Sequence, residues 1–67
     1  MMEGTMSDED YYTLDAFIKA VLRRVEAGEL DADSAHADIM HPLTAWDKGN
    51  ATEFGPWMKA RLAEWQG

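Results

Sequence analysis

The sequence predicts an all-α fold, a small three-helix domain with a short extra helical turn before the last helix. One observation is an apolar stripe at helical spacing in the first third of the chain. Glycine and proline then divide the remainder into short segments, at Gly28, Pro42 and Gly49. No alternating strand pattern of useful length is present. We expect one helical domain over residues 7–67, preceded by a flexible tail over residues 1–6, which lack periodicity.

The first helix is predicted to begin after Ser7, whose hydroxyl can cap it, and three acids in its first turn suit the positive end of the helix dipole. An apolar stripe follows, made of Tyr11, Leu14, Phe17, Ile18, Val21, Leu22 and Val25. These side chains fall within an arc of about 140°, so we expect this face to be buried. Gly28 stands where a left-handed residue would end the helix.

The second helix is predicted to be capped by Asp31 and to have a thin apolar face. That face consists of Ala32, Ala35 and Ile39, with Met40 off to one side. His41 precedes Pro42, and a residue before proline is disfavoured in helical geometry. We therefore expect this helix to stop near residue 40.

A short connecting turn is predicted from Pro42, with Leu43 and Trp46 on one face and a stop near Gly49. Asn50 and Glu53 have the spacing of a capping box.

The last helix is predicted to start at or near Pro56 and to carry a narrow stripe of Met58, Leu62 and Trp65. Phe54 joins this stripe if the helix begins earlier. We expect Trp46 and Trp65 to fill the core of so small a chain. Trp57 has two interpretations: core, or an exposed cation–π pair with Arg61 that anchors a partner.

Charge narrows the choice of partner. The 67-residue chain has thirteen acids against six bases, a net charge of −7. Such a chain is repelled by phosphate, so we expect no direct nucleic-acid binding, and the same argument disfavours a helix-turn-helix regulator. A basic protein partner, or simple solubility, fits better.

Catalytic and metal-binding patterns are missing from the sequence. There is no cysteine, so disulfides and thiolate metal sites are excluded. His36 and His41 are five positions apart, whereas metal-binding pairs on one helix are three or four apart. A calcium-loop comparison over residues 31–42 fails, and neither serine lies in a nucleophile elbow. We predict a non-enzymatic protein with neither cofactor nor metal.

Targeting signals are also missing. No apolar run approaches the length needed to cross a bilayer, and the first residues lack the pattern of a secretory signal. We expect a soluble cytoplasmic protein without a membrane association.

These observations lead to two hypotheses of function. The first is a small acidic protein-interaction module, an adaptor or regulatory protein, with a homodimer as one arrangement. Its expected contact residues are Trp57, Arg61, Trp46 and Lys48. The second is a phage-type inhibitor of a nucleic-acid enzyme that acts by negative-charge mimicry, because in composition the chain resembles anti-restriction and anti-CRISPR proteins. Its contact surface would consist of Asp8, Glu9, Asp10, Asp31, Asp33 and Asp38.

Overall fold

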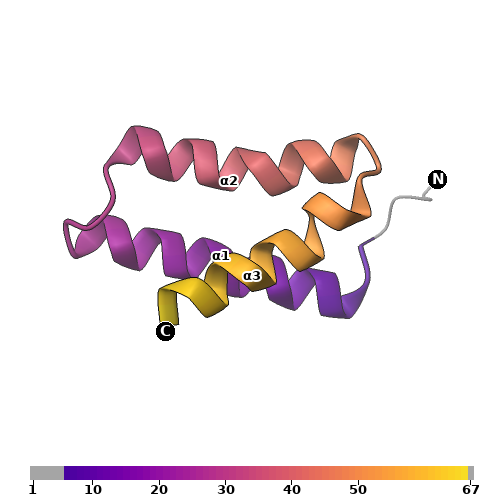
Figure 1. Ribbon diagram of the computed structural model, residues 1–67, viewed down its shortest axis with the longest axis horizontal. Helices are drawn as coiled ribbons and strands as arrows, with labels where there is room; N and C mark the ends of the chain where they lie inside the picture. Colours follow the sequence, from indigo (N-terminus) through magenta and orange to yellow (C-terminus); the bar gives the residue numbers. More distant parts are fainter. Residues whose placement is uncertain (1–5, 67) are drawn as a thin grey trace.

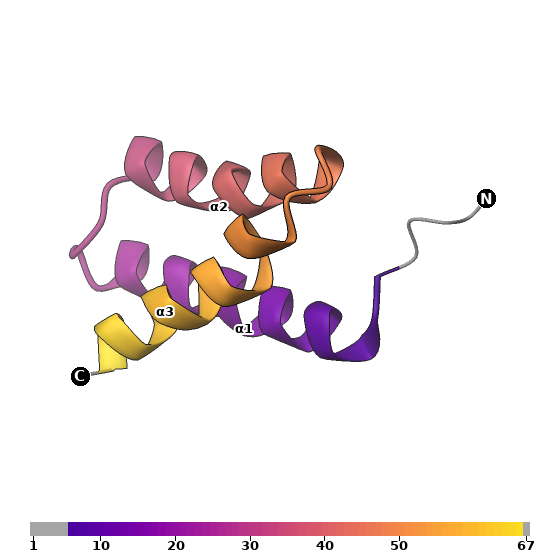
Figure 2. The same ribbon diagram turned by 45° about the vertical axis from the view of Figure 1, so that its right-hand side comes forward.

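A computed structural model describes residues 6–66 and shows the predicted three helices, with no strand in that range. They are α1 (Asp8–Glu26), α2 (Ala32–Asp47) and α3 (Gly55–Gln66), and the 3₁₀ turn η1 (Ala51–Glu53) precedes α3. Figure 1 shows α1 and α2 side by side in opposite directions, with α3 crossing α1 obliquely, and the turned view in Figure 2 agrees. The predicted fold class is confirmed.

The ends of α1 follow the sequence signals. The Ser7 hydroxyl accepts a hydrogen bond from the Asp10 backbone N–H at 3.1 Å, as expected of a cap. At the other end, Gly28 has a φ of +79°, a conformation that other residues rarely adopt. The predicted cap and stop of the first helix are therefore confirmed.

The prediction that the second helix stops near residue 40 is wrong. α2 begins at the expected Asp31 cap but continues through Pro42 to Asp47. Proline lacks an N–H, so one helical hydrogen bond, to the carbonyl of Asp38, is lost. The Pro42 ring is fully buried in the structure, and we attribute the continuation to this packing. The predicted connecting turn of residues 42–46 is thus the last part of α2.

The extra turn before the last helix exists, but it lies at η1 rather than at Pro42. Gly49 ends α2 with a φ of +73°, as predicted. The Asn50 side chain accepts a hydrogen bond from the Glu53 backbone N–H at 3.3 Å, which is half of the predicted capping box. In place of the other half, the Glu53 carboxylate contacts His41 on α2 at 2.9 Å.

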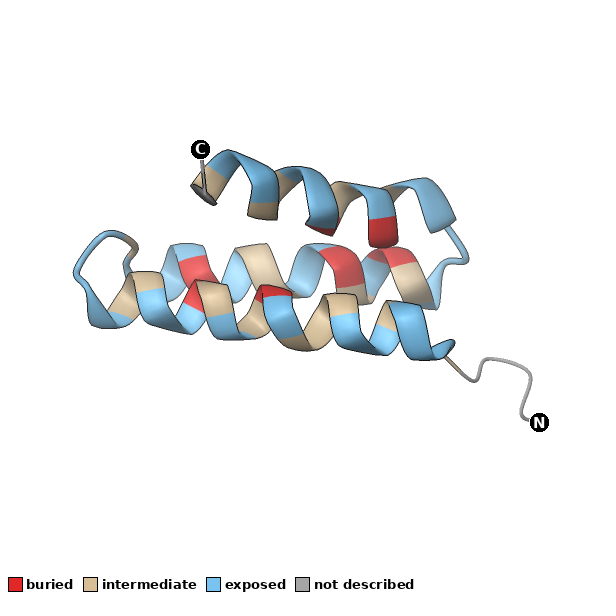
Figure 3. Cartoon of the chain, turned by 90° about the horizontal axis from the view of Figure 1, so that it is seen from below, coloured by how far each residue is buried: buried red, intermediate tan, exposed pale blue. Residues whose placement is uncertain are grey.

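The core lies where the three helices meet, and Figure 3 shows buried residues on their facing sides. It consists of Phe17, Val21, Ala35, Ala45, Phe54 and Met58. Phe17, Val21 and Met58 have no exposed surface. The predicted stripe of α3 is confirmed, because Met58 is in the core and Leu62 and Trp65 pack against it.

Two residues of the predicted α1 stripe are exposed. Tyr11 is 58% exposed and Leu22 is 55% exposed. Leu22 lies five positions after Phe17, which places it about 140° further round the helix. The two helices that cover α1 span a narrower arc than the seven-residue stripe, so its far edge faces solvent.

The remaining expectations for the fold concern tryptophans and the chain start. Trp46 and Trp65 are half-buried and pack against the core. Of the predicted tail, residues 1–5 lie outside the described residues, and Met6 packs against the core. Within residues 6–66, no helix has both the length and the apolar character needed to span a membrane.

Candidate functional site

The aromatic side chains of α3 pack on Phe17 of α1. The Trp57 ring meets the Phe17 ring edge-on, with their centroids 5.5 Å apart. The Trp65 ring stacks on Phe17 at the same centroid distance, with 16° between the planes. Phe17 is therefore held between two indoles that the sequence places eight positions apart.

Two arginines cover the indoles from outside. The guanidinium carbon of Arg24 lies 5.0 Å from the centroid of Trp65, and that of Arg61 lies 5.1 Å from it. Arg61 also lies 5.6 Å from the centroid of Trp57, so the predicted cation–π pair is present. The Nε atoms of both arginines are buried and have no hydrogen-bond partner among the described residues. Stacking on the indoles provides a physical reason, since it shields the guanidinium from water.

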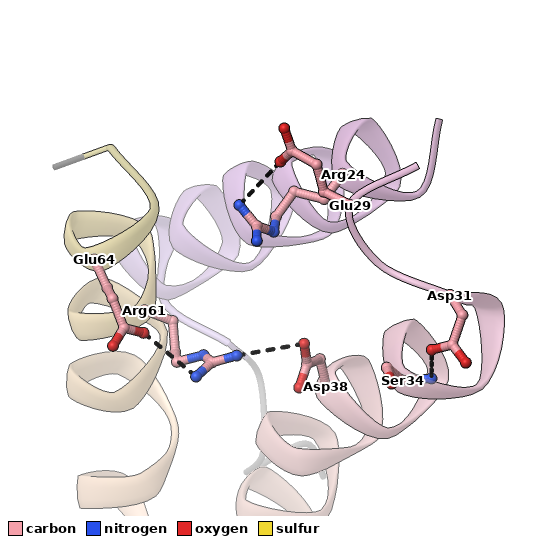
Figure 4. Close-up of polar contacts among 7 residues, drawn as sticks. All are labelled: Arg24, Glu29, Asp31, Ser34, Asp38, Arg61 and Glu64. Carbon is pink, nitrogen blue, oxygen red and sulfur yellow. Dashed lines mark hydrogen bonds and ion pairs between the residues drawn. The ribbon is translucent and has the colours of Figure 1, made fainter. Parts of the chain in front are cut away.

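Carboxylates hold these arginines in place (Figure 4). Arg61 extends from α3 to Asp38 on α2 at 3.5 Å, and its other terminal nitrogen contacts Glu64 at 3.4 Å. Arg24 pairs with Glu29 at 3.3 Å in the turn after α1. Arg61 therefore links α3 to α2 while it covers the aromatic cluster.

The histidines have separate surroundings. His41 stacks on Trp57 with ring centroids 4.1 Å apart, and its Nε2 contacts the Glu53 carboxylate at 2.9 Å. His36 is exposed on α2. In the described part of the chain, no group of three or more His, Cys, Asp or Glu residues is placed to hold a metal ion.

The four residues predicted to bind a partner are therefore found in different settings. Trp57 and Arg61 lie together but are engaged by the fold, through Phe17 and Asp38. Lys48 is exposed at the end of α2. Trp46 is near the end of α2, where its ring lies 5.1 Å from that of Phe54.

Trp46 also lines a pocket at the junction of α2, η1 and α3, here called the junction pocket, with a volume of about 630 Å³. The side chains and glycine that give it an apolar character are Ala45, Trp46, Ala51, Phe54, Gly55 and Pro56. Such a lining can accept a large apolar side chain.

The charged residues among the described lining of the junction pocket are both acids, Asp10 and Asp47. Asp10 is in the first turn of α1, and a methyl group on Gly55 would come within 3.4 Å of its Oδ1. This carboxylate therefore lies beside the start of α3, where the helix dipole favours a negative charge. Asp47 is the last residue of α2 and is exposed.

The six acids assigned to charge mimicry do not form one surface. Asp8, Glu9 and Asp10 are at the start of α1, whereas Asp31 and Asp33 are at the start of α2. Because these helices run in opposite directions, their starts lie at opposite ends of the molecule (Figure 1), about 28 Å apart along α1.

Several of these acids also have partners within the chain. Asp38 pairs with Arg61, and Glu9 contacts Lys59 on α3 at 2.7 Å. Hydrogen bonds from Ser34, first its side chain and then its backbone, hold the pKa of Asp31 below its ordinary value of 3.8. These acids contribute to helix capping and to contacts between helices.

The contact between Glu9 and Lys59 shifts the pKa values of both side chains. The hydrogen bond and the positive charge of Lys59 lower the pKa of Glu9 from its ordinary value of 4.5. The hydrogen bond and the negative charge of Glu9 raise the pKa of Lys59 from 10.5. Any stabilisation from the lowered Glu9 pKa is present above pH 4.5 and is lost as the pH falls through the lowered value. Stabilisation from Lys59 is present below pH 10.5 and is lost as the pH rises through the raised value.

We therefore expect Glu9→Gln to lower the free energy of unfolding at neutral pH, and the loss to shrink as the pH falls through the lowered Glu9 pKa or rises through the raised Lys59 pKa. The measurement is the urea midpoint of the wild type and the variant from about pH 3 to about pH 11. Glu26→Gln, which changes another exposed acid of α1, is the control and should not reproduce this profile. A difference between wild type and Glu9→Gln that stays constant through the acid range would contradict the assignment.

Sequence reasoning found Trp46 but missed the junction pocket. The sequence predicts that Phe54 joins the apolar stripe of the last helix, that Pro56 marks the start of that helix, and that Asp10 lies in the first turn of the first helix. Asp10 joins Phe54, Gly55 and Pro56 only because the start of α1 packs beside the start of α3. The acids at residues 8–10, and Asp47 beside an aromatic residue in a turn, are the one signal that could have indicated it.

Comparison with protein-family models, curated proteins and solved structures finds no match to this chain.

Proposed function

We propose that the chain is a small non-enzymatic protein-interaction module, an adaptor or regulatory protein, that holds its partner in the junction pocket. The observation that carries this proposal is the pocket itself, a hollow of about 630 Å³ beside the core of a 67-residue chain. Its apolar lining is suited to a side chain from another protein.

The contacts of the aromatic residues favour the junction pocket as the partner-binding site over a surface formed by Trp57 and Arg61. Trp57 and Arg61 contact residues of α1 and α2, so a partner that used them would compete with the fold. Trp46 has the Phe54 ring on one side and also lines the pocket. A small domain gains stability from any partner that binds only its folded form, and filling the pocket would supply such a gain.

Charge mimicry receives less support from the structure, because five of its six acids are divided between two ends of the molecule and three of the six have intramolecular partners. It stays the alternative hypothesis. Charge mimicry would be favoured if replacing both Asp31 and Asp33 by alanine abolished partner binding while variants of the junction pocket left binding unchanged.

The test of the proposed function blocks the junction pocket without entering the core. Ala51 lines the pocket and is itself exposed on η1, so Ala51→Trp should obstruct the pocket and leave the fold intact. Proteins captured by the wild-type chain from its native cells are purified, and their affinities for wild type and variant are measured by calorimetry. We expect Ala51→Trp to weaken binding by at least about tenfold.

Leu22→Ala is the matched control, because Leu22 is exposed on α1, away from the pocket. It should bind captured partners as the wild type does. Equal affinity of Ala51→Trp and wild type, or no partner retained at all, would refute the proposal. Circular dichroism is used to check that both variants are folded.

A further inference from the structure

We infer that the occupant of the junction pocket is a basic protein segment, one large apolar side chain flanked by lysine or arginine. This inference rests on the proposed function and names the chemistry of the partner. It follows from three features of the pocket: its size, its aromatic wall and the sign of the charge at its edge.

The size and wall specify a large apolar side chain. The rings of Trp46 and Phe54 are 5.1 Å apart and inclined at 47°, and both border the pocket. Phe54 is buried, whereas Trp46 is only half-buried, so an aromatic side chain entering here can pack on the Trp46 ring. Aromatic pairs add about 0.5–1.5 kcal/mol beyond area burial. The volume of about 630 Å³ leaves room for neighbouring backbone as well.

The charge specifies what flanks that side chain. Asp10 and Asp47 are the charged residues in the described lining, and they come from two different helices. Asp8 lies in the same first turn as Asp10, and the whole chain has a net charge of −7. Lysine or arginine beside the apolar anchor would face these carboxylates, whereas acidic residues there would be repelled.

The C-terminal end of α2 adds to this preference. Asp47 is the last residue of α2, where the dipole of the helix is already negative. A cation placed near Asp47 therefore meets a carboxylate and a helix C-terminus together. The exposed base that follows, Lys48, is not among the residues that line the pocket.

The experiment uses the full chain and short fluorescein-labelled peptides, with binding followed by fluorescence anisotropy at low salt. One peptide has a central phenylalanine flanked by lysines, a second has the same phenylalanine flanked by glutamates, and a third has lysines around an alanine. We expect the first to bind at least about tenfold more tightly than either of the others. Raising the salt concentration should reduce its advantage over the glutamate peptide.

Two matched charge reversals locate the effect. Asp47→Lys and Glu26→Lys each replace the last acid of a helix, so both change the net charge equally and both suit the helix dipole. Only Asp47 lines the junction pocket. We expect Asp47→Lys to weaken binding of the lysine-flanked peptide by about tenfold and Glu26→Lys to change it by less than about twofold.

The other outcomes each overturn the inference. Equal binding of the lysine and glutamate peptides, abolished by Ala51→Trp, would leave the proposed function standing and refute the basic occupant. Equal weakening by the two charge reversals would show non-specific attraction. If no peptide binds and sedimentation shows a wild-type dimer that Ala51→Trp dissociates, the occupant is a second copy of this chain. Peptides that fail to bind a monomeric wild type also refute the inference.

Discussion

Replacing Phe17 by alanine is expected to leave the chain largely unfolded at physiological temperature. The Phe17 side chain has no exposed surface and contacts the rings of both Trp57 and Trp65. Removing a buried phenylalanine side chain typically costs about 3–5 kcal/mol. A domain of this size rarely has more than about 3–5 kcal/mol of total stability, so the loss is comparable to all of it. The far-UV circular dichroism of the variant measures this directly.

Leu22→Ala is the control for that prediction, because Leu22 belongs to the same sequence stripe but is 55% exposed. Alanine is a better helix former than leucine, and little burial is lost. We expect a change in the free energy of unfolding within about 0.5 kcal/mol. Comparable damage from the two substitutions would mean that the buried arc of α1 is as wide as the sequence stripe and that the arrangement described is incorrect.

The second large effect is expected from Trp57→Ala, which should lower the free energy of unfolding by about 2–3 kcal/mol, somewhat less than for a fully buried ring. Trp57 contacts Phe17, stacks on His41 and lies beneath Arg61, so its removal disturbs all three helices. Urea unfolding measures the loss. Trp57→Phe keeps an aromatic ring, so it should lose less than half of the stability that Trp57→Ala loses.

If Trp57→Ala leaves the free energy of unfolding unchanged, this indole does not contribute to the stability of the fold. That result would restore the sequence-based interpretation of Trp57 as a partner anchor. The distinction also affects functional tests, because loss of binding in a partly unfolded Trp57 variant says nothing about the contact surface.

Local signals in the sequence predicted most of the fold. Ser7 and Asp31 cap their helices and Gly28 and Gly49 end them, because each acts through backbone groups a few residues away. Such effects depend on immediate neighbours in sequence, so a single chain is enough to identify them.

Errors arose where tertiary packing outweighs a local preference. Pro42 was predicted to start a new turn, yet burial of its ring keeps it within α2. Tyr11 and Leu22 fit the helical spacing of a buried face, but spacing does not reveal how much of that face two short helices can cover. These outcomes depend on partners that the sequence does not specify locally.

The candidate site was predictable only in part for the same reason. Trp46 was identified from its residue type and its place in a turn. Asp10 is 35 positions or more from the rest of the pocket lining, and it joins them through the packing of α1 against α3. A pocket assembled from residues so far apart has no spacing in the sequence to mark it.

The indoles of α3 pack against the core and maintain the fold, and we propose that the junction pocket is left for a partner. The most direct measurement is the change in amide NMR chemical shifts when labelled protein is titrated with the lysine-flanked phenylalanine peptide. We predict changes concentrated at Trp46, Ala51 and Phe54, which line the pocket. Changes concentrated instead at the exposed residues Tyr12 and Leu22, with the pocket unaffected, would contradict it.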